Sequence, residues 1–538
     1  MGITGDAIKA LALEHVALMS AIFIGSLALT FAVSLNKNQR DLYSVQNGRK
    51  VLSEKTVLVG GPDRSAWPWL TEIRARFRYM RAGHNDMFVA FKNYSGRILR
   101  APLADYSFFV LPPAYMEELK SLPPTTMSSS ISVEEYLLGG LTTMKAHDML
   151  GDITWQVVRN HLTQKLDNLV GPLAEANRNA FQDELPDCSD WTPVVVHDVF
   201  LQIVGRMTGR TFVGEKLSTN KLFLDTYIDF ATCVFVVSSY LKVLPAFLRP
   251  LFAPIIPEFW KIKRIHANNW KLLAPIVKAK KQEPKEQAEE RKAAGDGDML
   301  DWLLEASGPN ATVKEILTRQ LGIGFAAIHT TTNHMTNCLY DLAYRWDEYA
   351  PPLIAEYREA LRETDGVLQK QTLSKLSKLD SFMKESMRLN PPSSLAFNRK
   401  VLKDHTLSDG KVLPKSCWIA VPAGPLMLTE SQFPNPHVFD GFRYHRMRQE
   451  GSEESKTAAA KTSQFTSTGQ YSLVFGHGRF ACPGRFYAGV EIKLMLIHVL
   501  ENYELKLPDG SGRPQNFHFA DAGIPDPTKH VLFRKLKG

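Results

Sequence analysis

A ten-residue segment near the C-terminal end, Phe475 to Gly484, constrains this chain more than any other feature. It places an aromatic residue and two glycines before Cys482, and then Pro483 and Gly484 before an apolar run of helical character. Glycine allows a tight turn and a close approach to a flat ligand, and proline fits the first turn of a helix. The pattern predicts a cysteine held just before a helix; the alternative is a buried structural cysteine in a glycine turn.

A cysteine in this place lies near the positive end of the helix dipole and near free amide groups, which lower its pKa and favour a thiolate. Such a sulfur is suited to bind a metal as an axial ligand, and Phe475 would limit its access to water. The five cysteines of the chain are odd in number and scattered, without a CxxC pair. A disulfide framework and a zinc site are therefore not supported, and a reducing compartment is expected.

The segment resembles the haem-binding signature of the cytochrome P-450 family, Phe-x-x-Gly-x-Arg/His-x-Cys-x-Gly. Four positions match: Phe475, Gly478, Cys482 and Gly484. Phe480 departs, because the family has Arg or His there, so the contact to a haem propionate must come from elsewhere; the adjacent Arg479 is one candidate. The resemblance implies haem b as the cofactor, with Cys482 as the iron ligand and these neighbours around the haem.

Glu385 and Arg388 lie three residues apart, so they share one face of a helix and can pair. They resemble the Glu-x-x-Arg motif of the same family, and Asn390-Pro391-Pro392 follows at the expected distance. The resemblance implies a second arginine downstream, for which Arg443 is the candidate. We expect the three side chains to form a buried, bidentate structural triad behind the cysteine loop.

Between Leu321 and Leu342 an apolar stretch of helix length contains His329, followed directly by a run of threonines that begins at Thr330. These residues are awkward in a plain core helix, because threonine restricts χ1 and competes for the backbone. The stretch is similar to the family's distal motif Ala-Gly-x-Asp/Glu-Thr-Thr, which implies that the Thr330 hydroxyl helps to deliver protons at the oxygen-binding groove. Ala327 replaces the glycine and His329 replaces the acid. His329 is predicted to be catalytic as a proton relay; a salt link is the alternative.

Further contacts follow from the resemblance. Trp155 and Arg159 match Trp-x-x-x-Arg, and Arg399 matches another arginine that binds propionate. The alternatives are a core tryptophan and a solvated strand residue. The implied substrate pocket comprises Phe325, Ala326, Leu395, Phe397 and Ile524.

The fold is predicted to be mainly α with small β-sheets, a cytochrome P-450 fold preceded by one transmembrane helix. Helical periodicity is clear in Val157–Leu169, Val195–Val213 and Leu373–Leu389. Two extended runs, 86–94 and 97–99, look like a hairpin, and Ser107–Leu111 is a candidate strand. The charged stretch 280–298 indicates an exposed connector.

Residues 16–35 carry no charge and are long enough to cross a bilayer of about 30 Å. Basic residues follow the run, which predicts a cytoplasmic C-terminal side; a cleaved signal peptide is the alternative. The expected organisation is a lumenal N-terminus (1–15), a transmembrane anchor (16–35), a linker (36–70) and a haem-binding catalytic domain (71–538). The predicted location is the endoplasmic reticulum membrane, with a single pass.

The net charge of +8 does not indicate nucleic acid, because basic residues are interspersed with acids and no binding motif occurs. A basic docking face or contact with anionic lipid is the simpler explanation, and Arg479, Arg485 and Lys493 are the candidates for the docking face. The segment Leu241–Phe252 is apolar with scattered cations, and either dips into the bilayer or forms an interior helix pair.

The resemblance implies a monooxygenase that oxidises a hydrophobic small molecule with O2 and with electrons from NADPH through a flavoprotein reductase. The motif variants look most like fungal microsomal members that act in secondary metabolism, on terpenoids, polyketides or indole alkaloids. Two alternatives remain: a haem-thiolate enzyme of oxidative coupling or rearrangement, and a non-catalytic membrane haem protein.

Overall fold

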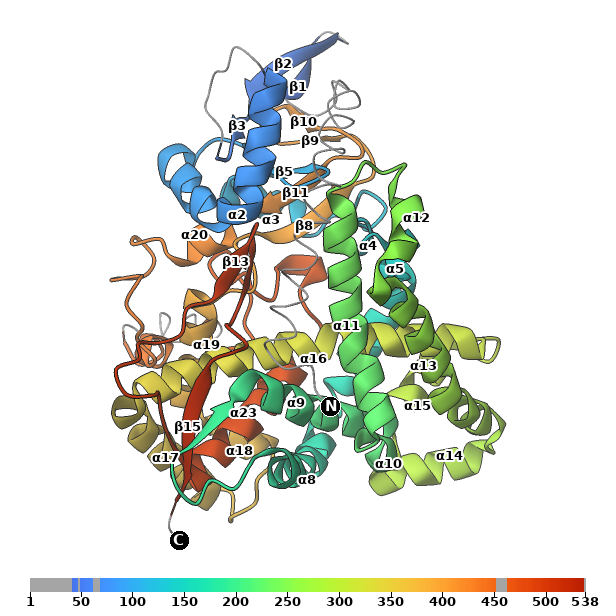
Figure 1. The fold of residues 1–538 in the computed structure, drawn as a ribbon, viewed down its shortest axis with the longest axis vertical. Helices are drawn as coiled ribbons and strands as arrows, with labels where there is room; N and C mark the ends of the chain where they lie inside the picture. Colours follow the sequence, from blue (N-terminus) through green and yellow to red (C-terminus); the bar gives the residue numbers. More distant parts are fainter. Residues whose placement is uncertain (1–40, 47–48, 61–67, 451–461, 537–538) are drawn as a thin grey trace.

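The structure is a computed structural model that describes residues 41–46, 49–60, 68–450 and 462–536. The predicted anchor, 16–35, lies outside these residues. Helices dominate, and the larger sheets gather at one end of the molecule with α2 (Figure 1).

The α-helices are α2 Pro68–Tyr94, α3 Met116–Leu119, α4 Ser129–Tyr136, α5 Gly139–Thr142, α6 Ala146–Met149, α7 Asp152–Val157, α8 Leu166–Glu184, α9 Val196–Val213, α10 Glu215–Ser218, α11 Lys221–Lys242, α12 Arg249–Phe252, α13 Pro257–Gln282, α14 Lys285–Arg291, α15 Met299–Ser307, α16 Val313–Tyr344, α17 Trp346–Arg362, α18 Lys370–Lys375, α19 Ser377–Leu389, α20 Ala423–Met427, α21 Arg443–Met447 and α23 Arg485–Asn502.

Short 3-10 and π turns connect several helices. The 3-10 turns are η1 Pro113–Tyr115, η3 Ala253–Ile255 and η5 Gly478–Phe480, and the π turns are η2 Val158–Leu162 and η4 Lys292–Asp296. The strands are β1 Asp41–Gln46, β2 Arg49–Lys55, β3 Val57–Leu58, β4 Leu99–Pro102, β5 Ser107–Val110, β6 Met127–Ser128, β7 Thr192–Val195, β8 Ala396–Val401, β9 His405–Thr406, β10 Lys411–Leu413, β11 Trp418–Val421, β12 Tyr503–Lys506, β13 Phe517–Phe519, β14 Ala522–Ile524 and β15 His530–Lys535.

The central helix is α16, which crosses the molecule from side to side in Figure 1. It begins at a capping box, in which the Thr312 hydroxyl accepts from the Glu315 amide and the Glu315 carboxylate accepts from the Thr312 amide. Two glycines let neighbours approach: a Cβ at Gly322 would lie 2.5 Å from Met149, and one at Gly324 2.2 Å from Tyr227. The predicted helix over 321–342 is therefore confirmed as part of a longer one.

The sheets are small. A six-stranded sheet has the order β3-β4-β5-β11-β8-β6, and a four-stranded sheet has the order β2-β1-β10-β9. The remaining sheets are β12-β15-β7 and the hairpin β13-β14. Because β1 pairs with β10 and β3 with β4, much of the segment predicted as a linker belongs to these sheets.

The predicted hairpin over 86–99 is wrong. Residues 86–94 continue α2, and Leu99 begins β4, which pairs antiparallel with the correctly predicted strand β5. Aromatic and β-branched residues gave this part of α2 a local preference for strand. Its buried residues Tyr79, Met87 and Ala90, however, follow a helical spacing that begins earlier in the chain.

The predicted connector over 280–298 is also largely helical, since α13, α14 and η4 occupy it. Several of its charges are paired. Arg291 donates to both carboxylate oxygens of buried Asp301, at 2.7 and 2.9 Å, and also binds Glu283. Lys280 binds Asp301 at 2.8 Å. The sequence pattern indicates that these charged side chains are solvated. In the structure, the paired ones form a network that holds α13, α14 and α15 together.

The segment 241–252 is partly buried in the protein and partly exposed. Leu241 and Leu244 are buried, whereas Phe247 is 59% and Leu251 70% exposed. Of the described residues, α11 alone is long and apolar enough to cross a membrane, and 56% of its most apolar window is buried inside the protein. It packs against α13 and α16.

A buried acid links α23 to α9. Glu491 is fully buried, accepts from the Thr208 hydroxyl at 3.0 Å and lies beside Tyr487, whose hydroxyl in turn bonds to Thr211 at 2.9 Å. Its second carboxylate oxygen has no hydrogen-bond partner among the described residues. Burial raises the pKa of Glu491 to about 8, so the acid is neutral near pH 7.

The raised pKa of Glu491 predicts a pH-dependent stability. Folding favours the protonated acid, so its contribution is complete below the ordinary pKa of 4.5 and is lost as the pH rises through about 8. We expect Glu491→Gln to flatten this fall and to raise the free energy of unfolding by up to about 3 kcal/mol at neutral pH. Urea unfolding from pH 5 to pH 9 measures it, with surface Glu504→Gln as the control. A parallel slope for wild type and Glu491→Gln would contradict the prediction.

Candidate active site

The cysteine loop precedes α23, as predicted. The Cys482 amide donates to the Phe475 carbonyl at 2.7 Å, which closes the turn. Gly476 and Gly478 have φ of 71° and 72°, in the left-handed region that favours glycine. At Gly478 a Cβ would also lie 2.6 Å from the Lys120 carbonyl oxygen, which accepts from the Arg479 amide at 3.0 Å. Only glycine fits this position without strain.

The expected lowering of the Cys482 pKa is wrong for the protein alone. The amides of Gly484 and Arg485 and the Arg485 guanidinium do lower it, as a helix start should. Burial acts in the opposite direction and is the larger effect, so the pKa of the Cys482 thiol is raised. A coordinated metal ion would oppose this effect, because its charge deprotonates a bound thiol.

An aromatic contact that the sequence did not reveal connects α16 to the cysteine loop. Phe465 stacks on His334 of α16 at 5.2 Å between ring centroids, and its edge meets Phe475 at 5.3 Å. Phe465 is 1% exposed. It lies in a polar stretch that is typical of a surface loop, and the only signal is its isolated aromatic character. Through this residue, α16 and the cysteine loop share one packed core.

One face of α16 is open in the middle of an otherwise buried helix. Ala326 and Thr330, one turn apart, are exposed, while Ile328, Thr331 and Thr332 beside them are buried. The Thr330 hydroxyl donates to the Ala326 carbonyl at 2.7 Å. The open face is therefore small and apolar apart from one hydroxyl.

The His329 side chain lies against the backbone of α11. Its Nε2 lies 2.8 Å from the Ile228 carbonyl oxygen of α11, so the ring donates there and Nε2 carries the proton. Burial lowers the pKa of His329, which keeps the ring neutral. The salt-link alternative is wrong, because the partner is a backbone carbonyl. A catalytic proton relay stays a prediction.

Trp155 and Arg159 lie beside the cysteine loop. Arg159 belongs to the π turn η2 that follows α7, and its guanidinium carbon is 5.0 Å from the Trp155 ring centre. A Cβ at Gly484 would lie 3.8 Å from Val158 of the same turn. The turn therefore presents Arg159, whose side chain is exposed, next to the residue that follows Cys482 and Pro483.

Arg399 is buried, at 5% exposure, so the solvated-strand alternative is wrong. Its Nη1 donates to the Asn398 carbonyl at 2.9 Å, and its Nη2 has no hydrogen-bond partner among the described residues. Burial lowers the pKa of Arg399 to about 9. A buried guanidinium with an unused donor is suited to bind an anionic group that the protein does not supply.

The structural triad has the predicted contacts. Arg388 donates to both oxygens of Glu385, at 2.8 and 2.7 Å, and Arg443 donates to one of them at 3.2 Å. All three side chains are buried. Arg388 also donates to the carbonyls of Met427 and Pro436, which ties α19 to the chain ahead of the cysteine loop.

Two candidates for the basic docking face are engaged inside the protein. Arg485 donates to the carbonyls of Thr466 and Cys482, at 3.0 and 2.7 Å, and Lys493 pairs with buried Asp380 at 2.8 Å. Of the three residues, only Arg479 is exposed. Arg485 therefore stabilises the loop, and Lys493 joins α23 to α19, so neither presents a free charge.

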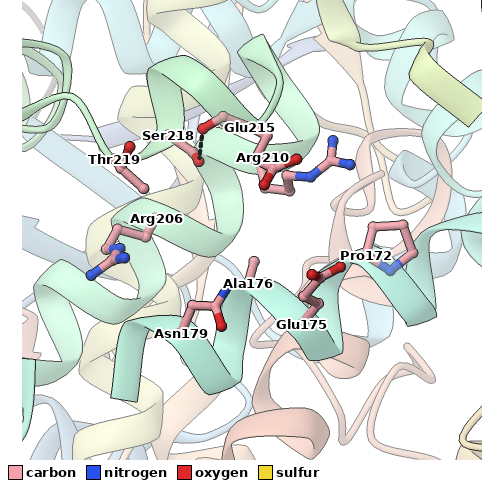
Figure 2. A pocket seen from close by; sticks show the side chains of 9 residues that line it. All are labelled: Pro172, Glu175, Ala176, Asn179, Arg206, Arg210, Glu215, Ser218 and Thr219. Atoms are coloured by element: carbon pink, nitrogen blue, oxygen red, sulfur yellow. Dashed lines mark hydrogen bonds between the residues drawn. The ribbon is translucent and has the colours of Figure 1, made fainter. Parts of the chain in front are cut away.

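The predicted substrate-pocket residues are not all open to a ligand. Ala326 is exposed and Ile524 is 47% exposed, but Leu395 and Phe397 are each only 3% exposed. Phe325 turns toward α11, where it packs against Phe230 and Phe235. A charged surface pocket between α8, α9 and α10, shown in Figure 2, is lined by none of the predicted site residues.

The residues fit a haem. A cysteine at a glycine turn, a buried arginine with an unused donor, and an open apolar face on the central helix match a sulfur ligand, a propionate contact and a distal groove. Within the described residues, no group of three or more His, Cys, Asp or Glu side chains could hold a metal ion. The cysteine turn, the buried arginine and the open face of α16 are the features that a haem-thiolate site needs.

Comparisons agree with this geometry. The family model "Cytochrome P450" matches residues 149–533. The monooxygenase olcJ of Penicillium canescens is 36% identical over 92% of this chain and 91% of its own length. An ent-kaurene oxidase of Gibberella intermedia is 31% identical over 86% of this chain and 85% of its own length. A solved structure, retinoic acid bound cyanobacterial CYP120A1, has the same fold, with a TM-score of 0.63 and 19% identity over 90% of this chain and 100% of its own.

The chain therefore belongs to the cytochrome P450 family. It is a monooxygenase of the type that its fungal relatives represent, and haem is its family cofactor.

Proposed function

We propose that this enzyme oxidises a hydrophobic small molecule, a fungal secondary metabolite, by hydroxylation or by several oxidations in sequence. The observation that carries the proposal is the exposed Ala326–Thr330 face in the middle of α16. It offers a substrate an apolar surface with a single hydroxyl beside it. Terpenoids come first among the candidate classes, because two of the relatives are named ent-kaurene oxidases, at 31% and 30% identity; polyketides and indole alkaloids follow.

We assign a role to each residue of the haem site. Cys482 holds the haem iron through its sulfur, and Phe475 shields that sulfur from water, with Gly478 and Gly484 allowing the cofactor to come close. The haem propionates are bound by Arg399, Arg159 and Trp155. Exposed Arg479 is therefore not needed for the propionate contact. When bound, the haem supplies the activation of dioxygen, which the thiolate promotes by donating electron density. The triad of Glu385, Arg388 and Arg443 holds the loop in place.

Thr330 delivers protons at the distal face. Its hydroxyl hydrogen bonds to the Ala326 carbonyl, so it can rotate to donate elsewhere while staying on the open face. The His329 ring, held by Ile228, positions α16 against α11 and stays neutral. The substrate rests on Ala326, with Ile524 near the surface and with the packed residues Phe325, Leu395 and Phe397 behind the lining.

Electrons come from NADPH through a flavoprotein reductase. We place the enzyme in the endoplasmic reticulum membrane with 16–35 as a single anchor, and the catalytic domain, 71–538, on the cytoplasmic side. The apolar run 16–35 and the exposed Phe247 and Leu251 on the domain support this location.

The test uses yeast microsomes that contain the full chain and a reductase, supplied with a panel of terpenoids, polyketides and indole alkaloids. We expect one class to stimulate NADPH consumption and to gain oxygen by mass. Thr330→Ala should lower the product formed per NADPH about tenfold or more, because a general acid contributes at least that much. Buried Thr331→Val is the matched control and should keep the ratio.

Other results would favour the alternatives. A product that has lost hydrogen or has been rearranged without gaining oxygen would indicate oxidative coupling or rearrangement. A haem-loaded protein that no class stimulates would indicate a non-catalytic membrane haem protein.

A further inference from the structure

Phe480 stands where the haem-binding signature has Arg or His, and it contacts the guanidinium of Arg399. The guanidinium carbon lies 4.5 Å from the Phe480 ring centre and 4.4 Å from that of Phe397. Both distances are within the range of cation–π attraction, which is strongest for desolvated pairs. One ring belongs to the cysteine loop and the other to β8, so two separate elements meet at one cation.

Arg399 is otherwise poorly held. It is 5% exposed, its Nη2 has no hydrogen-bond partner among the described residues, and its Nη1 binds only the carbonyl of the preceding residue. A cation buried without a carboxylate beside it is destabilising unless another anion completes the site. The rings therefore supply the attraction that no acidic side chain provides.

The backbone is strained at Phe397, whose ring takes part in this arrangement. Its φ is 62°, in the left-handed region that bulky residues rarely adopt. Strain of this kind persists where the surrounding structure over-determines the backbone, often at a ligand site. Here it lies two residues before Arg399 and accompanies a ring packed against that side chain.

We propose that Phe480 is a positioning residue: its ring, together with that of Phe397, holds the Arg399 guanidinium in place to bind a haem propionate. The loss of the direct donor at position 480 is thereby compensated through Arg399. The proposal rests on the haem site described above and assigns a use to the one position at which the loop departs from its signature.

Haem transfer from the purified full-length holoenzyme to excess apomyoglobin tests the proposal. Phe480→Leu, which keeps an apolar side chain but removes the ring, should speed haem loss about tenfold. Phe480→Tyr, which keeps the ring, should stay within about twofold of the wild type. In an Arg399→Met background, which removes the cation, Phe480→Leu should add little, because its effect passes through the guanidinium. Phe397→Leu should speed haem loss in the same way. It provides a second test if one of the two variants binds haem poorly.

Trp191→Leu is the matched control. Trp191 lies 4.4 Å from the Arg534 guanidinium, far along the chain from the cysteine loop, and its loss should not change haem transfer. If Phe480→Leu and Phe397→Leu speed haem loss by the same factor in the wild-type and in the Arg399→Met backgrounds, the rings act only by filling space and the proposal is overturned. Unchanged haem loss in both variants overturns it too. A wild type without a thiolate-type haem spectrum would instead overturn the proposed function itself.

Discussion

Cys482→Ala is expected to abolish the thiolate-type haem spectrum and all turnover. With carbon monoxide, the reduced wild type should absorb near about 450 nm, as thiolate-ligated haem does. The other four cysteines are buried, so none of them presents an open thiol in place of Cys482. Difference spectroscopy of purified protein, together with haem content per chain, measures the effect.

Cys188→Ala is the control for this experiment. Cys188 is a free thiol like Cys482, but it is buried and lies near β15, where its carbonyl accepts from the Lys535 amide. It should keep the wild-type spectrum. If Cys482→Ala retained haem with an unchanged spectrum, the assignment of the iron ligand would be wrong, and the proposed function would fail with it.

Glu385→Ala should lower the free energy of unfolding by about 3 to 5 kcal/mol, because it leaves the buried guanidinium groups of Arg388 and Arg443 without their carboxylate. The Asp440 amide would lose its acceptor as well. Haem content should fall in parallel, since the triad ties α19 to the segment before the cysteine loop. Urea unfolding, followed by circular dichroism and by haem absorbance, measures both effects.

Glu504→Ala provides the comparison, because Glu504 pairs with Arg534 at the partly exposed surface. Such a pair contributes less than about 1 kcal/mol. An equally small effect of Glu385→Ala would show that the buried triad is not what holds this part of the fold together.

The sequence predicted the parts of the site that local spacing determines. The turn at Gly478, the helix after Cys482 and the pairing of Glu385 with Arg388 all follow from residues a few positions apart. The third member, Arg443, came only from the resemblance, because nothing local brings it to Glu385.

Properties set by long-range packing could not be predicted. The Cys482 pKa depends on burial, which outweighs the helix start. The strand-like end of α2 is helical because its buried face continues from Tyr79. The environment of Arg399 depends on the φ of Phe397 and on the ring of Phe480, which lies far along the chain, and neither is visible in local composition.

With the proposed anchor at 16–35, the pairing of β1 with β10 would limit how far the catalytic domain can stand from a bilayer. An extended chain spans at most about 3.5 Å per residue, so with an anchor ending at Leu35 the strand that starts at Asp41 begins within about 20 Å of it. Because β1 is hydrogen-bonded into a sheet of the domain, this short tether would restrict tumbling and keep one end of the molecule facing the lipid. A hydrophobic substrate dissolved in the membrane would then meet a surface of nearly constant orientation.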